Sequence, residues 1–305
     1  MRTQSKKVFL MVFLIVCINP VSRAHPVPKP LSYHYLPPSN SESPVEERAE
    51  KEKKIPPNYF AIVFYKPTYI LPYYYTGSPY QSVYKNHTPN GDHIERSETK
   101  YQLSFKVPAW KNVLNNPSTL YLAYTQLSYW QAYNRTAFFR ETDYEPEIFL
   151  ANETNLPFFH EWKINFVNIG AIHQSNGFGD SMERSWNRIY IEAISSTDNL
   201  MISIKPWLVV HDRGFRNHNP NMANFLGYGQ VLVAYKFYNQ VFTIAAHNLI
   251  EGGGRHATFE GTWSLPITAY LNVYLQFFSG YGQSLIEYDH RTTSGGIGIA
   301  LSNWI

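Results

Sequence analysis

The sequence predicts an all-β protein, a single transmembrane antiparallel β-barrel of about twelve strands. Three observations predict this fold. Short segments that alternate apolar and polar residues recur along the chain, as strands with two unlike faces require. No stretch after the N-terminal leader approaches the ~20 consecutive apolar residues of a membrane helix. Aromatic residues make up 16% of the chain, with 24 tyrosines, which fits an outer-membrane barrel.

The first 24 residues predict a cleaved secretory signal. A basic start is followed by an apolar run over residues 8–18 and by a small-x-small cleavage site that ends at Ala24. The apolar run is too short to span a bilayer. The only cysteine, Cys17, lies inside this leader, so the mature chain is expected to hold no disulfide bond.

The mature chain is nearly neutral. The sequence has 26 basic and 23 acidic residues. Four of the basic residues and none of the acidic ones lie in the leader, which leaves 22 against 23 and a net charge of −1. Such a balance gives no support to nucleic-acid binding, which rests on an excess of Lys and Arg. An exported chain of this composition fits an outer-membrane barrel, and it also fits a secreted β-sandwich.

Residues 25–57 predict a flexible N-terminal extension. They are rich in Pro and Ser and end in a charge run over residues 46–54, a composition that favours disorder or loose packing. The barrel domain is expected over residues 58–305, because the alternating segments begin after this run.

The alternating segments follow one another at short spacing through the barrel domain. In one of them Tyr101, Leu103 and Phe105 face one way, while Gln102 and Ser104 face the other. Strands are expected near residues 60–64, 101–107, 120–130, 147, 167–175, 187–193, 202–208, 231–237, 242–246, 259–265, 267–277 and 297–305. An even number of antiparallel strands, with the last one at the C-terminus, suits a closed barrel that leaves no edge.

The stretch from residue 173 to 187 brings together the residue types of a catalytic triad. In an extended strand His173 and Ser175 share one face, roughly 7 Å apart along the strand. The turn-rich segment 176–183 lets the chain fold back, so that Asn187 lands on the next strand beside His173. A candidate nucleophile, base and orienting group would then come from one hairpin.

The parity of these three residues indicates where such a site would lie. They share their faces with apolar residues such as Ile169 and Ile189, whereas Arg188 and Glu192 lie on the opposite face. In a soluble protein the apolar face is the core, and a buried triad would reach no substrate. In a membrane barrel the apolar face meets lipid and the polar face fills the interior. The parity therefore predicts hydrolysis of an acyl ester on the outer face of a barrel.

Gln126 breaks the pattern of its strand. Leu120, Leu122 and Tyr124 set an apolar parity, and Gln126 falls on it. An amide that faces lipid is costly unless it finds a partner. The side chain is expected either close to the membrane surface or in a hydrogen bond across a subunit interface.

Beyond the triad pattern, several motifs resemble a known family, the outer-membrane phospholipases A. They are H-x-S-N-G with S-W-N-R, Y-T-Q-L-S-Y-W-Q (124–131), F-R-E-T-D-Y-E-P-E (139–147), I-K-P-W (204–207), P-I-T (266–268) and S-G-Y-G-Q-S-L-I-E-Y (279–288). They keep the family's order and approximate spacing from about residue 101 to 305, about two thirds of the chain. The extension before Ile55 is not covered.

The resemblance implies a twelve-stranded barrel of the bacterial outer membrane, a homodimer with one Ca²⁺ per active site. It implies phospholipase A1 and A2 activity on membrane phospholipids and lysophospholipids. Ser175 would be the nucleophile, His173 the general base and then acid, and Asn187 the group that orients the imidazole. The asparagine oxygen can accept the Nδ1 hydrogen without placing a charge at the lipid boundary. The Gly177 amide would serve as oxyanion donor.

The resemblance also implies the calcium ligands. They would be the carbonyl of Phe178, the side chain of Glu183 and, from the partner subunit, Thr136. The sequence departs from the family at each position, since an arginine is usual for Phe178, a serine for Glu183, and a serine in a longer loop for Thr136. Gln126 matches the family's polar contact in the dimer interface.

Two other classes of function are weighed against the lipase. A passive pore or structural barrel would carry the triad incidentally, because polar inward residues are expected in both cases. A secreted soluble esterase would partition into the aqueous phase without detergent.

Overall fold

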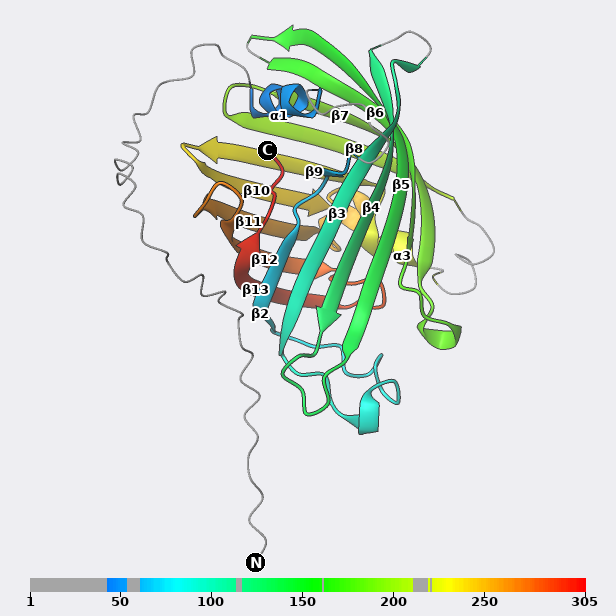
Figure 1. Cartoon of the computed structure of the whole chain (residues 1–305). Helices are drawn as coiled ribbons and strands as arrows, with labels where there is room; N and C mark the ends of the chain where they lie inside the picture. The colour runs from blue at the N-terminus through cyan, green and yellow to red at the C-terminus, as the bar shows by residue number, and fades with distance from the viewer. Residues whose placement is uncertain (1–42, 54–60, 114–116, 161, 211–218, 220) are drawn as a thin grey trace, which may run out of the picture. The chain divides into compact units, whose positions relative to one another are not determined.

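The computed structural model describes residues 43–53, 61–113, 117–160, 162–210, 219 and 221–305. The predicted signal and Cys17 lie outside the described residues. Figure 1 shows a sheet of long strands that wraps round on itself. No helix among the described residues is long and apolar enough to cross a membrane.

In the described part of the chain, thirteen strands form one antiparallel sheet, and the β3–β4 pairing closes it into a barrel. β3 pairs with β4 along one edge, and β1 and β2 pair with different stretches of its other edge. β1 and β2 therefore share one position, and the barrel has twelve strand positions, as predicted. The strands are β1 (Val63–Phe64), β2 (Tyr69–Thr76), β3 (Ser97–Lys111), β4 (Ser118–Trp130), β5 (Phe139–Phe159), β6 (Trp162–Ser175), β7 (Ser185–Ser196), β8 (Leu200–Val210), β9 (Gly229–Phe237), β10 (Gln240–His247), β11 (Thr258–Pro266), β12 (Asn272–Tyr281) and β13 (Arg291–Ala300).

The two faces of the wall differ as the sequence parity predicts. On β6 and β7 the outward Ile169 and Ile189 are 51% and 52% exposed, whereas the inward Ile172 and Tyr190 are buried. The inward Arg188 forms an ion pair with Glu145 at 2.8 Å. An apolar surface outside and paired charges inside are the arrangement that a lipid surround favours.

One strand position differs from its prediction. The segment 60–64 was expected to supply the first strand, but β1 contains only Val63–Phe64, and most of this position is β2. β2 shows no clean alternation because its register shifts between Leu71 and Tyr74, around Pro72. A proline lacks the N–H that a regular ladder needs, so it is found at such irregularities. Residues 267–271, predicted as strand, form the turn that precedes β12.

The described part of the predicted flexible extension is ordered, as helix α1 (Pro44–Lys53). The backbone N–H of Ser43 donates to Glu46 at 2.9 Å, and the N–H of Glu46 donates to the Ser43 hydroxyl at 3.2 Å, which is a capping box. Arg48 donates to the carbonyl of Trp304 at 2.8 Å, and Glu52 pairs with Lys106 of β3 at 2.8 Å. Arg48 and Glu52 of the charge run therefore have partners outside the helix, and α1 lies at the end that carries the C-terminus (Figure 1).

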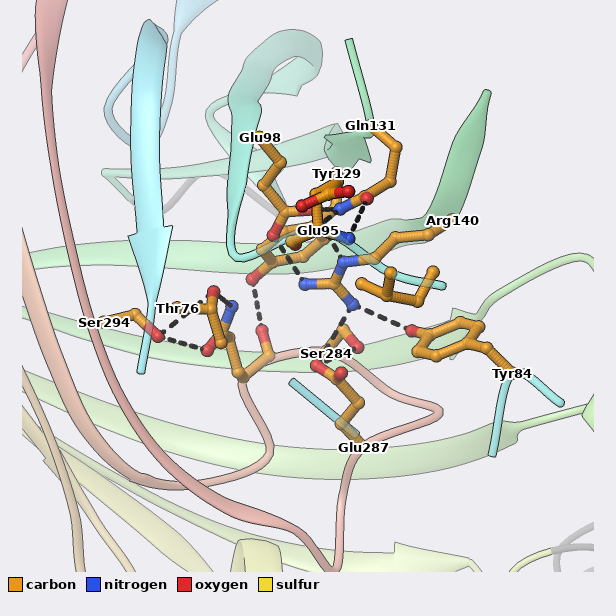
Figure 2. A network of polar contacts seen from close by, with 12 residues as sticks. Thr76, Tyr84, Glu95, Glu98, Tyr129, Gln131, Arg140, Ser284, Glu287 and Ser294 are labelled. Atoms are coloured by element: carbon orange, nitrogen blue, oxygen red, sulfur yellow. Dashed lines mark hydrogen bonds and ion pairs between the residues drawn. The ribbon is translucent and has the colours of Figure 1, made fainter. Parts of the chain in front are cut away.

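The loops at the other end of the barrel pack together. Tyr84, Ile94, Met182 and Ile286, from three different connections, form one buried cluster. Beside it Arg140 contacts the carboxylates of Glu98 and Glu287 and the Tyr84 hydroxyl, as Figure 2 shows. The short helices are η1 (Pro89–Gly91), η3 (Asp180–Met182), α3 (Met222–Leu226) and η4 (Glu251–Gly254). Inside the barrel, beside α1, lies a cavity of about 470 Å³.

Candidate active site

His173 and Asn187 are direct cross-strand partners on β6 and β7. The imidazole Nδ1 lies 2.8 Å from the Asn187 Oδ1. An amide oxygen only accepts, so this contact places the hydrogen of a neutral imidazole on Nδ1. The other ring nitrogen, Nε2, is then a proton acceptor. The strand register alone produces this pairing, because residues directly opposite in a ladder have neighbouring side chains.

Ser175 is the last residue of β6, two residues beyond His173 on the same outward face. It lies opposite Ser185 of β7 and Tyr144 of β5, and it is partly exposed. No hydrogen bond joins Ser175 to His173 in this structure, and catalytic hydrogen bonds often tighten only when substrate binds. The structure thus gathers the three predicted residues on one small area of the outer wall.

Tyr144 is a residue of this area that the sequence analysis did not single out. Its side chain is 37% exposed on the outward face of β5, with Ser175 on one neighbouring strand and Gln126 on the other. A Cβ placed on Gly177 would lie 3.0 Å from the Tyr144 ring. The parity of Tyr144 with Ile148 was the signal that could have identified it.

The loop that follows Ser175 carries the other predicted site residues. Gly177 has a φ of +68°, a conformation that glycine adopts without strain. Among the described residues, none accepts a hydrogen bond from the Gly177 N–H, so this amide is available to a ligand. Phe178 is 38% exposed. η3 turns the chain back toward β7, and Glu183 is the residue that ends it.

The predicted calcium ligands offer oxygen atoms, the donors that calcium prefers. The Phe178 carbonyl and the Glu183 carboxylate belong to the same short loop. Thr136 lies on the separate β4–β5 connection, where its hydroxyl accepts from Asn90 at 3.2 Å. No group of three or more His, Cys, Asp or Glu side chains suited to a metal occurs in the described part of the chain. A metal at this loop would therefore need carbonyl and hydroxyl ligands besides Glu183, which is the composition of the predicted set.

Gln126 finds hydrogen-bond partners on its own strand. Its Oε1 accepts from the Tyr124 hydroxyl at 3.1 Å, and its Nε2 donates to the Ser128 hydroxyl at 3.1 Å. The Thr142 hydroxyl also donates to Ser128. The amide keeps one further donor and one further acceptor position, so an additional contact is open to it.

A closed antiparallel barrel with an apolar outer wall, interrupted by a His–Asn pair and a serine, defines an integral membrane β-barrel protein with a candidate hydrolytic site at the lipid boundary. The comparisons with known proteins make this specific. The model of the phospholipase A1 family matches residues 45–301. A phospholipase A1 of Proteus vulgaris is 34% identical over 248 residues, which cover 81% of this chain and 83% of that protein.

Solved structures agree with the family match. The outer membrane phospholipase A from Escherichia coli superposes with a TM-score of 0.76 at 32% identity, covering 81% of this chain and 94% of that one. The outer membrane phospholipase of Salmonella typhi, solved as a dimer with bound calcium, superposes with a TM-score of 0.75 at 31% identity. The match again covers 81% of this chain and 94% of that one. The chain therefore belongs to the phospholipase A1 family. As a member it is an enzyme, a phospholipase of the outer membrane.

Proposed function

We propose that this enzyme hydrolyses the sn-1 and sn-2 acyl esters of membrane phospholipids and lysophospholipids through Ser175, His173 and Asn187. The observation that carries the proposal is the 2.8 Å contact between His173 Nδ1 and Asn187 Oδ1 on the lipid-facing wall, with Ser175 two residues away on the same face. An acyl ester of a membrane lipid would meet this area without leaving the membrane.

The proposed chemistry follows the general route of serine hydrolases. His173 Nε2 accepts the hydroxyl proton as Ser175 Oγ attacks the ester carbonyl, and His173 returns that proton to the leaving alcohol oxygen. A water molecule then attacks the acyl carbon while His173 Nε2 accepts its proton, and His173 returns that proton to Ser175 Oγ as the acyl–Oγ bond breaks and the fatty acid leaves. Asn187 keeps the imidazole in the tautomer whose Nε2 is free to accept. The Gly177 N–H donates to the oxyanion.

We further propose that one Ca²⁺ binds at each active site. The Phe178 carbonyl, the Glu183 carboxylate and the hydroxyl of Thr136 of the partner subunit would hold it. When bound, the ion supplies positive charge beside the oxyanion and orients a water molecule there. The Salmonella typhi relative, a dimer with bound calcium, supports this assignment. Glu183 places a full negative charge on the loop, which favours a divalent cation.

The same relative supports a homodimer for this chain. Gln126 is proposed to make a contact across the interface through the donor and acceptor positions that its own strand leaves open. A site completed by the partner's threonine would make activity depend on dimerisation. We also propose that residues 1–24 are removed during export and that residues 25–57 and 58–305 form an extension and the barrel.

A passive pore is the alternative, and the two mouths of the barrel weigh against it. α1 is fastened at one end through Arg48 and Glu52, and packed loops occupy the other end around Arg140. The interior between them holds buried ion pairs, among them Lys205 with Glu147 at 3.2 Å. Occupied mouths and ion pairs across the interior weigh against an open channel.

The test is phospholipid hydrolysis by refolded protein in detergent micelles, with calcium, with a chelator, and with Ser175→Ala in calcium. If only the wild type in calcium is active, the result would support both Ser175 as nucleophile and the requirement for calcium. Activity in chelator would remove calcium from the proposal and leave the lipase. A folded dimer without activity in any condition would sink the lipase and favour the structural barrel.

A further inference from the structure

The Asn176 side chain uses all of its hydrogen-bonding positions in the loop between β6 and β7 (residues 176–184). It follows Ser175 directly and is 4% exposed. Its Oδ1 accepts from the backbone N–H of Arg184 at 3.0 Å and of Phe178 at 3.3 Å. Its Nδ2 donates to the Met182 carbonyl at 2.9 Å and to Glu141 Oε1 at 3.2 Å. An asparagine amide has two donor hydrogens and two acceptor positions, and all four are used here.

These bonds tie the loop to itself at both ends. The backbone N–H of Asn176 donates to the Arg184 carbonyl at 3.0 Å, so Arg184 and Asn176 hold each other through backbone and side chain. The segment between them contains Gly177 and Phe178, the proposed oxyanion donor and calcium ligand. A loop closed in this way loses little further conformational freedom when substrate or calcium binds.

The fourth bond fastens the loop to the barrel. Glu141 is buried on β5, and its Oε1 also accepts from the backbone N–H of Ile286 at 3.0 Å. Two residues along, Asp143 accepts from the N–H of Leu285 at 3.1 Å. The β12–β13 connection is therefore held on Glu141 and Asp143, and Glu141 is the carboxyl group that also holds Asn176. An extra residue, Arg140, inserted at the β4–β5 register shift, lies inside the barrel beside Glu141 and binds Glu287 of that connection (Figure 2).

We infer that Asn176 is a positioning residue for the reaction: through its bond to Glu141 it holds the loop so that the Gly177 N–H and the Phe178 carbonyl face the ester and the calcium ion. This inference rests on the proposed function. Asn176 touches neither substrate nor metal; it acts through the two backbone groups that follow it. Its polar groups all point away from lipid, which separates its role from that of the outward His173 and Ser175.

Asn176→Ala removes all four side-chain bonds. We expect kcat to fall about 10²-fold or more, the loss that follows removal of one oxyanion donor, with KM for phospholipid little changed. The calcium concentration for half-maximal activity should rise about 10-fold or more, as for other residues that support a metal ligand. The measurement is hydrolysis in micelles across a calcium titration, with folding checked by far-UV circular dichroism and by the mobility of unheated protein on a denaturing gel.

Asn165→Ala is the matched control. Asn165 is fully buried on the same strand β6 at the opposite end, where it accepts from the Ser196 hydroxyl at 2.7 Å. The same amide is lost far from the site, so kcat and the calcium midpoint should stay at wild-type values. If both variants lost activity equally, the effect would be one of barrel stability and the inference would be overturned.

Asn176→Asp tests the donor separately and also serves if the alanine variant does not fold. It keeps the size and the Oδ1 acceptor but places a carboxylate against Glu141. We expect a similar loss of kcat, and about 10-fold recovery when Glu141→Gln is added, because a neutral amide in place of one carboxylate removes the repulsion between the two groups. No recovery, or wild-type kcat and calcium midpoint in Asn176→Ala, would overturn the inference. An inactive wild type would instead contradict the proposed function.

Discussion

At the scale of single residues, the candidate site depends on groups whose chemistry is separable. In the proposed mechanism Ser175 supplies the atom that bonds to the acyl carbon and His173 moves the proton, while Asn187 holds the imidazole by one 2.8 Å contact. Because the roles differ, their substitutions should differ in severity. The aliphatic neighbours Ile169 and Ile189 keep the surroundings apolar, which strengthens hydrogen bonds at the site.

Ser175→Ala and His173→Ala should each reduce hydrolysis to background while the barrel stays folded, because each removes a group without which no acyl-enzyme forms. The measurement is release of fatty acid from a phospholipid in micelles. Ile169→Ala is the control, because it also introduces an alanine on the same outward face. It should leave turnover near the wild-type rate. Wild-type turnover in either of the first two variants would refute the assignment.

Asn187→Ala should reduce kcat about fivefold or more, since the loss of one neutral hydrogen bond costs about 1 kcal/mol and leaves the imidazole free to rotate. The loss should be smaller than that of His173→Ala, because the base itself remains. Steady-state kinetics of the two variants side by side give the comparison. Equal losses would mean that Asn187 does more than orient the ring.

At the scale of elements, the loop after β6 and the helix α1 are the parts whose conformation depends on distant partners. The loop has Glu183 and Phe178 at its two sides, and α1 has Arg48 and Glu52 against the barrel wall. Each is short, so neither is stable alone. Their partners lie elsewhere in the chain, so substitution of a single partner should disturb the loop or the helix without altering the strand ladder.

Removing calcium should stop turnover without unfolding the barrel, because the proposed ligands are on loops outside the strand ladder. Glu183→Gln should raise the calcium concentration needed for half-maximal activity, since a neutral amide attracts a divalent cation less. The calcium titration and the circular dichroism spectrum are recorded on the same samples. Full activity in chelator, or an unchanged calcium midpoint in Glu183→Gln, would count against the metal assignment.

The docking of α1 should weaken in acid. Burial raises the pKa of the Glu52 carboxyl, but the positive charges of Lys106 and Arg48 outweigh it and hold the pKa below its ordinary value of 4.5. A lowered pKa means that the ion pair stabilises docking above pH 4.5 and that this contribution is lost as pH falls through the lower, folded-state pKa. Hydrogen exchange of the α1 amides, corrected for intrinsic rates, should accelerate below that range. Glu52→Gln should remove this pH dependence.

At the scale of the whole molecule, one wall divides two environments. Outside it, apolar side chains meet lipid around the candidate site; inside it, ion pairs such as Arg188–Glu145 fill the barrel. The proposed dimer would add a second copy against the same outer wall. Lipid, the candidate site and the partner subunit would then share one surface, which favours control of the activity by dimerisation.

Gln126→Leu should weaken dimerisation in detergent, because it removes the open donor and acceptor positions of an outward-facing amide. Chemical crosslinking at several protein concentrations measures the effect, with Leu122→Ala on the same face as a control for lost apolar contact. Crosslinking of Gln126→Leu at the wild-type level would show that the amide serves only Tyr124 and Ser128 within its own barrel.

The sequence by itself determined the number of strand positions, the two faces of the wall and the shared face of His173 and Ser175. All three follow from the period of two, a local property of any extended chain. The partnership of His173 with Asn187 needed only a hairpin of the right register. The family motifs then supplied the function that the pattern alone left open between lipase and pore.

Only the tertiary structure decided the remaining features. It placed β2 around an irregularity at Pro72, and it packed α1, which had been predicted as part of a flexible extension, against β3 and the C-terminus. It also joined Asn176 to Glu141, 35 residues apart in the chain. For α1 and for Asn176 the physical reason is the same: both arrangements depend on hydrogen bonds or ion pairs between residues distant in the sequence, and periodicity carries no information about such partners.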